Sequence, residues 1–161
     1  ASKSFAWSGG RVGCAGFPTV EEALDFRNLN SNYFSCVLPY NQEAARYAIL
    51  CDTSPARCRE MSASFQARRD VVVRALNAID GISCKRPRGA FYVFPNITGL
   101  GLTSKQVESR MLDEYGVAAL AGTSFGAFGE GYLRFSYANS QENLREGVAR
   151  MARFVDDLGK S

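Results

Sequence analysis

The longest hydrophobic pattern in the chain is helical and runs from Ala56 to about Ile79. Its apolar stripe carries Met61, Phe65, Val72, Leu76 and Ile79. Charged residues, most of them arginines, fall largely outside that stripe, as expected of an amphipathic helix with one buried side. A helix of this length can join two domains. We therefore place a domain boundary within it and divide the chain into residues 1–60 and 61–161.

Before the long helix, the pattern predicts a strand, a helix and a connection. The apolar run at 12–17 is ended by Pro18 and predicts a short buried strand. Thr19 can cap a following helix, whose first turn carries glutamates that suit the helix dipole. Residues 27–40 are rich in asparagine, serine and aromatic side chains and predict an irregular connection. A short helix is expected at 42–50.

After the long helix, strands and helices alternate. The expected strands are 82–86, 90–95, 117–120 and 132–137, and further helices are expected to be capped by Ser104 and Ser140. The residues expected on the buried sides of these helices are Val107, Met111, Leu112, Val148, Met151 and Phe154. This alternation predicts an α/β layer that covers an active site rather than containing one.

The composition of the chain limits the classes of function that it can have. The chain has 161 residues, 46% of them hydrophobic, which is enough for one core and part of a second. Its 19 basic and 16 acidic residues give a net charge of +3 without long like-charge runs, which argues against nucleic acid as a partner. No apolar run is long enough to span a membrane, so no membrane partner is expected either.

Side-chain chemistry narrows the choice further. The five cysteines form no CxxC pair and are odd in number, so we expect neither a disulfide framework nor a metal site. Reduced thiols fit an intracellular, cytoplasmic protein. The chain has no histidine, and acid–base chemistry must therefore use another group, for which lysine is the obvious candidate.

Two cations near the amino end lie among small and apolar residues. Lys3 and Arg11 have no acid close by in sequence, because the first carboxylate of the chain is Glu21. Four glycines follow the lysine, at positions 9, 10, 13 and 16. They leave the backbone open, which suits a phosphate held by main-chain amides and a guanidinium, and a lysine beside a phosphate site can bind an aldehyde cofactor. The alternative is two solvated cations in a glycine-rich loop.

One predicted strand carries an arginine inside an aromatic run. In residues 132–138, the period of two places Arg134 on one face and three large apolar side chains on the other. The nearest acids in sequence lie beyond the strand ends. We therefore hypothesise that Arg134 binds a carboxylate ligand in a bidentate manner. The alternative is an edge-strand arginine that reaches water along its aliphatic stem.

The segment SKSFAWSGGRVG, residues 2–13, resembles the pyridoxal-phosphate attachment motif of the class I and II aminotransferases, a family of fold type I. In that resemblance, Lys3 falls on the Schiff-base lysine and Arg11 on the arginine that holds the cofactor phosphate. Two positions depart from the commonest form of the motif. Trp7 stands where methionine or leucine is usual, and Gly10 stands where tryptophan is common.

Further segments resemble the same family, in the expected order. YLRFSYA is similar to its arginine strand, which implies that Arg134 grips the substrate α-carboxylate. PRGAFYVFP and GTSFG are similar to other family segments. The resemblance covers nearly the whole chain and implies an α/β fold, the C-terminal part of a fold-type I aminotransferase. Residues 1–60 would end the large cofactor-binding domain, and residues 61–161, joined to it by the long interdomain helix, would form the small domain.

The resemblance implies a pyridoxal-phosphate-dependent aminotransferase that acts on an amino acid and a 2-oxo acid. Lys3 would carry the cofactor and, once freed, move a proton between the substrate α-carbon and the cofactor. A homodimer is also implied, with Asn30–Tyr33 near the dimer interface. Because the motif begins at the second residue, we expect this chain to be a piece of a longer protein. We expect the activity in that parent protein, and none measurable in the isolated chain.

Two other functions stay open at this point. A carbon–sulfur or α,β-eliminating lyase of the same fold uses the same lysine and arginines. A non-catalytic interaction module, built on the amphipathic helix and the asparagine-rich loop, is the alternative from a different class.

Overall fold

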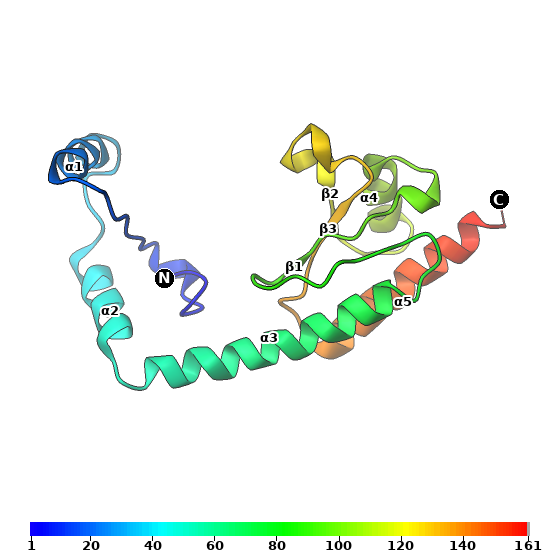
Figure 1. Ribbon diagram of the computed structural model, residues 1–161, viewed down its shortest axis with the longest axis horizontal. Helices are drawn as coiled ribbons and strands as arrows, with labels where there is room; N and C mark the ends of the chain where they lie inside the picture. Colours follow the sequence, from blue (N-terminus) through cyan, green and yellow to red (C-terminus); the bar gives the residue numbers. More distant parts are fainter. Residues whose placement is uncertain (161) are drawn as a thin grey trace. The chain divides into compact units, whose positions relative to one another are not determined.

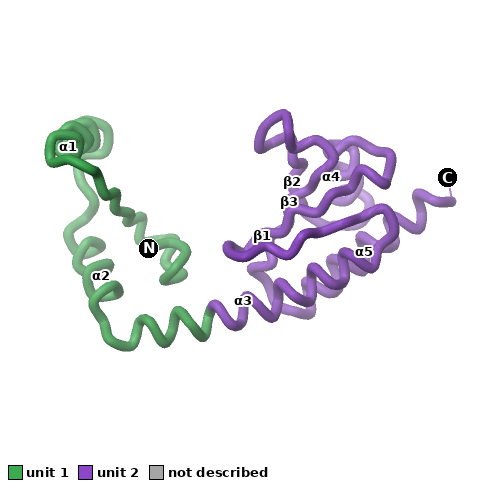
Figure 2. Tube along the Cα trace, in the orientation of Figure 1, with its two compact units in different colours: residues 1–61 green, residues 62–161 purple. Residues whose placement is uncertain are grey.

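The computed structural model describes residues 1–160 and is a mixed α/β structure. It divides into two compact units, residues 1–61 (unit 1) and the residues from Ser62 onward (unit 2), and this boundary falls within helix α3 (Figure 2). The helices are α1 (Val20–Phe34), α2 (Pro39–Leu50), α3 (Ser54–Leu76), α4 (Ser104–Asp113) and α5 (Gln141–Leu158) (Figure 1). The strands are β1 (Tyr92–Val93), β2 (Leu120–Ala121) and β3 (Leu133–Ser136).

Unit 2 is built on a three-stranded antiparallel sheet with strand order β1-β3-β2. One face of the central strand β3 enters the core, where Leu133 is fully buried and Tyr137, just after the strand, is nearly so. Helices α3, α4 and α5 bring apolar sides to the same core. The helix residues buried there are Val72, Leu76, Val107, Met111, Met151 and Phe154. Burial of these side chains decides which face of β3 points inward.

The predicted long helix and closing helix are both confirmed. Ser140 caps α5, since its hydroxyl accepts a hydrogen bond from the Asn143 amide at 3.1 Å. In α3, Arg69 is an exception to the prediction that charged residues fall largely outside the buried stripe, because its side chain is buried. Its guanidinium is compensated there, donating to Asp70 Oδ1 at 2.9 Å and to the Pro87 carbonyl oxygen at 3.2 Å.

Helix α4 differs from the prediction in its cap and in one side chain. Thr103, rather than Ser104, is the N-cap, in a reciprocal capping box with Gln106. Leu112 is 54% exposed instead of buried. It follows Met111 by one residue, and a helix turns about 100° per residue, so it points away from the core that Met111 enters.

The strands are shorter than predicted. Strand β3 is confirmed, but of the strands expected at 82–86 and 90–95 only β1 and an isolated bridge between Ser83 and Asn96 form. The strand expected at 117–120 starts only at its last residue. The Val117 amide, at the start of this segment, donates to the Met111 carbonyl oxygen at 2.9 Å. Because this hydrogen bond ties the start of the segment to the end of helix α4, only its last residue pairs with the sheet.

Unit 1 departs further from the prediction. Residues 12–17 form no strand, because no bridge joins them to any described residue, and most of them are exposed. A strand needs a neighbour to take its backbone hydrogen bonds. The predicted cap of α1 is confirmed, since the Thr19 hydroxyl accepts from the Glu22 amide at 3.2 Å.

The irregular connection predicted at 27–40 is wrong for most of its length. Helix α1 continues to Phe34, and Pro39 already starts α2. Ser31 Oγ and Asn32 Nδ2 donate to carbonyl oxygens four residues earlier, both at 2.9 Å, so these polar side chains bond within the helix instead of ending it. Proline suits the first turn of a helix, where its missing N–H is no loss.

A buried hydroxyl ties helix α4 to the start of β3. Ser104 Oγ accepts hydrogen bonds from the Gly131 amide at 2.9 Å and the Tyr132 amide at 3.1 Å. The Glu130 carboxylate accepts from the Ser104 amide at 2.8 Å and from the Gly131 amide at 3.1 Å. The bond from the Ser104 amide is the largest cause that lowers the Glu130 pKa. These bonds set the path of the chain just before Arg134.

Replacing Ser104 with alanine should destabilise unit 2, because two amides lose a buried acceptor. We expect a loss of about 1–3 kcal/mol in the free energy of unfolding, measured by urea denaturation. Ser109→Ala, on the exposed side of the same helix, is the matched control and should leave the midpoint unchanged. Equal stability of the two variants would contradict the role given to the Ser104 hydroxyl.

The Glu130 carboxylate should make stability depend on pH. Its folded-state pKa lies below the ordinary 4.5, so its contribution is complete above pH 4.5 and is lost as the pH falls through the lower folded value. Glu130→Gln should therefore show a flatter loss of stability between about pH 5 and about pH 3 than the original chain, in urea titrations at each pH. Superimposable pH profiles of the two proteins would rule this contribution out.

Candidate functional site

The two cations near the amino end lie in one loop of unit 1. Lys3 occupies a turn and is exposed. Arg11 follows the short 3-10 turn η1 (Ser8–Gly10) and takes the left-handed conformation, with φ 49° and ψ 44°. Its side chain is exposed, and Nη1 donates to the Ser8 carbonyl oxygen at 3.3 Å. One short segment therefore carries both an amine and a guanidinium on exposed residues.

Helices α2 and α3 each form one hydrogen bond with this loop, at a residue adjacent to a cation. The Cys58 thiol on α3 donates to the carbonyl oxygen of Ser4, the residue after the lysine, at 3.3 Å. Asn41 Nδ2 on α2 donates to the carbonyl oxygen of Gly10, the residue before the arginine, at 2.9 Å. These anchors act on the main chain, so they fix the path of the loop while both cationic side chains stay exposed.

The donor set of the loop fits an aldehyde cofactor that carries a phosphate. A lysine amine can bind an aldehyde covalently, and a guanidinium can bind phosphate through two parallel hydrogen bonds. The backbone is open at Gly13, two residues after Arg11, since no other part of the chain lies within 4 Å of the position that a side chain would take there. Pyridoxal phosphate has both chemical groups, so the residues present fit it.

Arg134 lies on β3 in unit 2, on the face of the strand turned away from the core. Its guanidinium carbon is 4.5 Å from the centre of the Tyr92 ring, on β1, and 4.3 Å from the centre of the Phe125 ring. We call these two rings the aromatic clamp. Within residues 1–160, no carboxylate forms an ion pair with this guanidinium. Ring faces attract the charge but leave the N–H donors in its plane for an anion.

Neighbouring aromatic side chains support the clamp. Phe94 stacks on Tyr132, with ring centres 5.3 Å apart, and meets Phe125 edge-on at 6.2 Å. Sequence reasoning missed the roles of both clamp rings. Both rings belong to segments already singled out from the sequence, PRGAFYVFP and GTSFG. Which ring of each segment faces the arginine depends on strand pairing, however, and neither segment by itself predicts that pairing.

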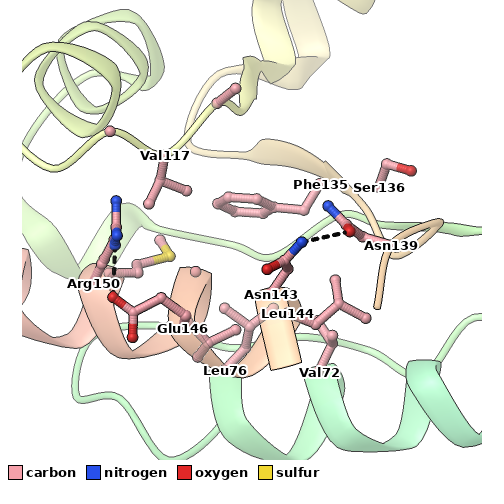
Figure 3. Close-up of a pocket in the computed structure, with 15 residues that line it drawn as sticks. Val72, Leu76, Val117, Phe135, Ser136, Asn139, Asn143, Leu144, Glu146 and Arg150 are labelled. Atoms are coloured by element: carbon pink, nitrogen blue, oxygen red, sulfur yellow. Dashed lines mark hydrogen bonds and ion pairs between the residues drawn. The ribbon is translucent and has the colours of Figure 1, made fainter. Parts of the chain in front are cut away.

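A separate groove of about 360 Å³ lies on the helix side of unit 2 (Figure 3). Its apolar lining includes Val72, Leu76, Val117, Phe135 and Leu144. At its rim, Arg150 Nε donates to Glu146 Oε1 at 2.8 Å, so this charge is already paired. Phe135 lines the groove and follows Arg134 in β3, so the two side chains point to opposite faces of the sheet. The groove is therefore not part of the arginine site.

The five cysteines are all free thiols. The pKa of Cys51 is lowered to about 7, chiefly by a hydrogen bond with the Thr53 hydroxyl at 3.2 Å, whereas burial raises the pKa of Cys84. Among the residues that the structure describes, no group of three or more acidic or cysteine side chains is placed to hold a metal ion. No helix in that part of the chain is long and apolar enough to cross a membrane.

The predicted site residues thus fall in both units. Lys3 and Arg11 share one loop of unit 1, and Arg134 stands on the sheet of unit 2. The loop carries an amine that can react with an aldehyde and a guanidinium that can bind a phosphate, and the strand carries a guanidinium that can bind a carboxylate.

Known proteins resemble the chain along nearly all of its length. The family description "Aminotransferase class I and II" matches residues 1–151. The aspartate aminotransferase of Pyrococcus horikoshii is 36% identical over 155 residues, which cover 96% of this chain and 39% of that protein. The aromatic-amino-acid aminotransferase 2 of Thermococcus litoralis is 36% identical over 158 residues, which cover 97% and 40%. The chain therefore spans about 40% of the length of these relatives.

Solved structures show the same fold. The aromatic aminotransferase from Pyrococcus horikoshii OT3 matches with a TM-score of 0.88 and 38% identity, over 97% of this chain and 41% of that one. The aspartate aminotransferase from Rhizobium meliloti matches with a TM-score of 0.85 and 34% identity, over 96% of this chain and 40% of that one. With sequence and fold in agreement, the chain belongs to the class I and II aminotransferase family.

Proposed function

We propose that this chain is the C-terminal part of a pyridoxal-phosphate-dependent aminotransferase that acts on an amino acid and a 2-oxo acid. The observation that carries the proposal is the anchored loop that exposes both Lys3 and Arg11. The activity is proposed for the full-length protein, because the chain spans about 40% of the length of its relatives. Residues 1–60 would end the cofactor-binding domain, and residues 61–161 would form the small domain.

Each cation of the loop has a separate task in this proposal. When bound, pyridoxal phosphate supplies an aldehyde for covalent attachment and a ring that withdraws electrons from the substrate. Lys3 would hold the cofactor through Nζ and, once released, take the proton from the substrate α-carbon as a general base. Arg11 would hold the phosphate in the fork of its guanidinium. Since the chain has no histidine, a lysine amine is the natural base within it.

Arg134 would bind the α-carboxylate that amino acid and 2-oxo acid substrates share. The guanidinium carbon lies over the faces of both clamp rings, and its N–H donors point outward in the guanidinium plane, where a carboxylate can bind. Two parallel hydrogen bonds would restrict rotation of the substrate and so orient the bonds at its α-carbon. The relatives above are named for aspartate and for aromatic amino acids, whose common feature is the group that Arg134 is proposed to bind.

The proposed assembly is a homodimer in the cytoplasm. Helices α1 and α2 expose large apolar side chains, and exposed apolar patches mark contact surfaces. Those exposed by more than half are Val20, Phe26, Leu29, Tyr33, Phe34, Tyr40, Tyr47, Ile49 and Leu50. Asn30–Tyr33, which the family resemblance assigns to the vicinity of the dimer interface, lie within this surface. Free thiols suit the reducing conditions of the cytoplasm.

Borohydride reduction of the full-length protein in the presence of pyridoxal phosphate should leave a pyridoxyl group on Lys3, because reduction traps an amine joined to an aldehyde. Peptide mapping by mass spectrometry locates the modified residue. Lys3→Arg keeps the charge without the reactive amine and should lose the adduct, whereas Lys105→Arg, on the exposed side of α4, should keep it. A folded full-length protein without any adduct would contradict the proposal and favour the interaction module. Ammonia as product, in place of a new 2-oxo acid, would favour the lyase.

Arg134→Lys should raise KM for both substrates about 10- to 100-fold, with a smaller change in kcat. An ammonium keeps the charge but cannot form the bidentate pair with a carboxylate. Steady-state kinetics of the full-length protein measure the effect, with Arg145→Lys on the exposed side of α5 as matched control. If both variants keep the original KM, carboxylate binding by Arg134 is disproved.

A further inference from the structure

The ring of Trp7 lies directly against Gly10. A Cβ atom on Gly10 would come within 2.3 Å of Trp7 Cε2, 2.5 Å of Cδ2 and 2.6 Å of Cζ2. Gly10 is buried, and its φ is not in the left-handed region, so the contact with the indole, rather than backbone strain, is what excludes a side chain there. Trp7 is half-buried and is the only tryptophan of the chain.

The contact between Trp7 and Gly10 lies within the loop that joins the two proposed cofactor residues. Lys3 precedes Trp7 by four residues, and Arg11 directly follows Gly10. The loop contains two non-glycine residues in the left-handed conformation, Ala6 at φ 50° and Arg11 at φ 49°. Such residues persist where surrounding packing holds them. The indole on Gly10, together with the side-chain bond to the Gly10 carbonyl oxygen, supplies that packing.

Trp7 and Gly10 are also the two positions at which the loop departs from the commonest attachment motif. In the structure, the two residues that depart from the motif contact each other. The Trp7 ring lies where a Cβ atom on residue 10 would stand, and glycine at position 10 leaves room for it. A side chain on residue 10 does not suit the loop while Trp7 is present, because the two would need the same space. Without the Trp7 ring, Gly10 would lose the side chain that packs on it.

We propose that Trp7 and Gly10 form a coupled pair that sets the separation of Lys3 from Arg11, with Trp7 as a positioning residue for the cofactor phosphate. The identity of the ligand rests on the proposed function, whereas the coupling rests on the contact itself. Displacement of the indole would move the Gly10 end of the loop, and with it Arg11. The other end is held separately, by the Cys58 thiol bond beside Lys3.

The test compares pyridoxal phosphate binding by the full-length protein and its variants. Gly10→Ala places one methyl group at the indole contact and should raise Kd about tenfold, measured by equilibrium dialysis of the apoprotein. The absorption maximum of the bound cofactor should shift as well. Gly147→Ala, at an open position of helix α5, is the matched control and should leave Kd and spectrum unchanged.

A double variant separates a coupled pair from two independent losses. Trp7→Met and Gly10→Trp should each raise Kd when made alone, but combined they return the indole to position 10 and should bring Kd to within about threefold of the original. The melting temperature of each variant distinguishes altered loop geometry from unfolding. Additive effects of the two changes, or an unchanged Kd in folded Gly10→Ala, would overturn the coupled pair.

The two proposals fail in different ways. An unsubstituted protein that forms no lysine adduct would overturn the proposed function and, with it, the role of Trp7 in positioning the cofactor phosphate, while the contact between Trp7 and Gly10 would stand. An unsubstituted protein that forms the adduct, with folded Gly10→Ala binding equally well, would overturn the coupled pair alone.

Discussion

The alternation of side chains along β3 is the constraint on which unit 2 depends. Leu133 and Tyr137 are held in a core that three helices contribute to, and the two-residue period then sends Arg134 to the opposite face. There its guanidinium contacts the rings of Tyr92 and Phe125. A shift of one residue in the pairing of β3 would turn Arg134 toward the core and Leu133 away from it. Burial of the apolar side chains therefore determines the face of the sheet on which Arg134 lies. The buried hydroxyl at the start of α4 holds the chain in that register.

Unit 1 positions its cations by a different means. Ala45 is the one apolar side chain of residues 1–61 that is buried, so a core cannot hold the loop. Hydrogen bonds to the carbonyl oxygens of Ser4 and Gly10 do so instead, helped by the indole packed on Gly10. Because these contacts use the main chain and a glycine, the side chains of Lys3 and Arg11 stay exposed, as a ligand requires.

Elements whose determinants are local were predicted well from the sequence. The long helix α3, the caps at Thr19 and Ser140 and the strand that holds Arg134 all depend on residues within a turn or two of one another. The resemblance to the class I and II aminotransferases is confirmed for the same reason, since its motifs are short and contiguous. The misassigned segments 12–17 and 27–40 depend on conditions that the pattern does not contain, a neighbouring strand in one and helical bonding by polar side chains in the other.

The sequence by itself determined the family, the helical pattern and the candidate residues Lys3, Arg11 and Arg134, because their chemistry and spacing are visible in a linear string. Only the tertiary structure decided how those residues are held. Strand pairing brings the clamp rings to Arg134 from two distant segments, and left-handed backbone turns lay Trp7 on Gly10. Such contacts depend on which groups share space after folding, and hydrophobic periodicity describes only which side of an element is buried.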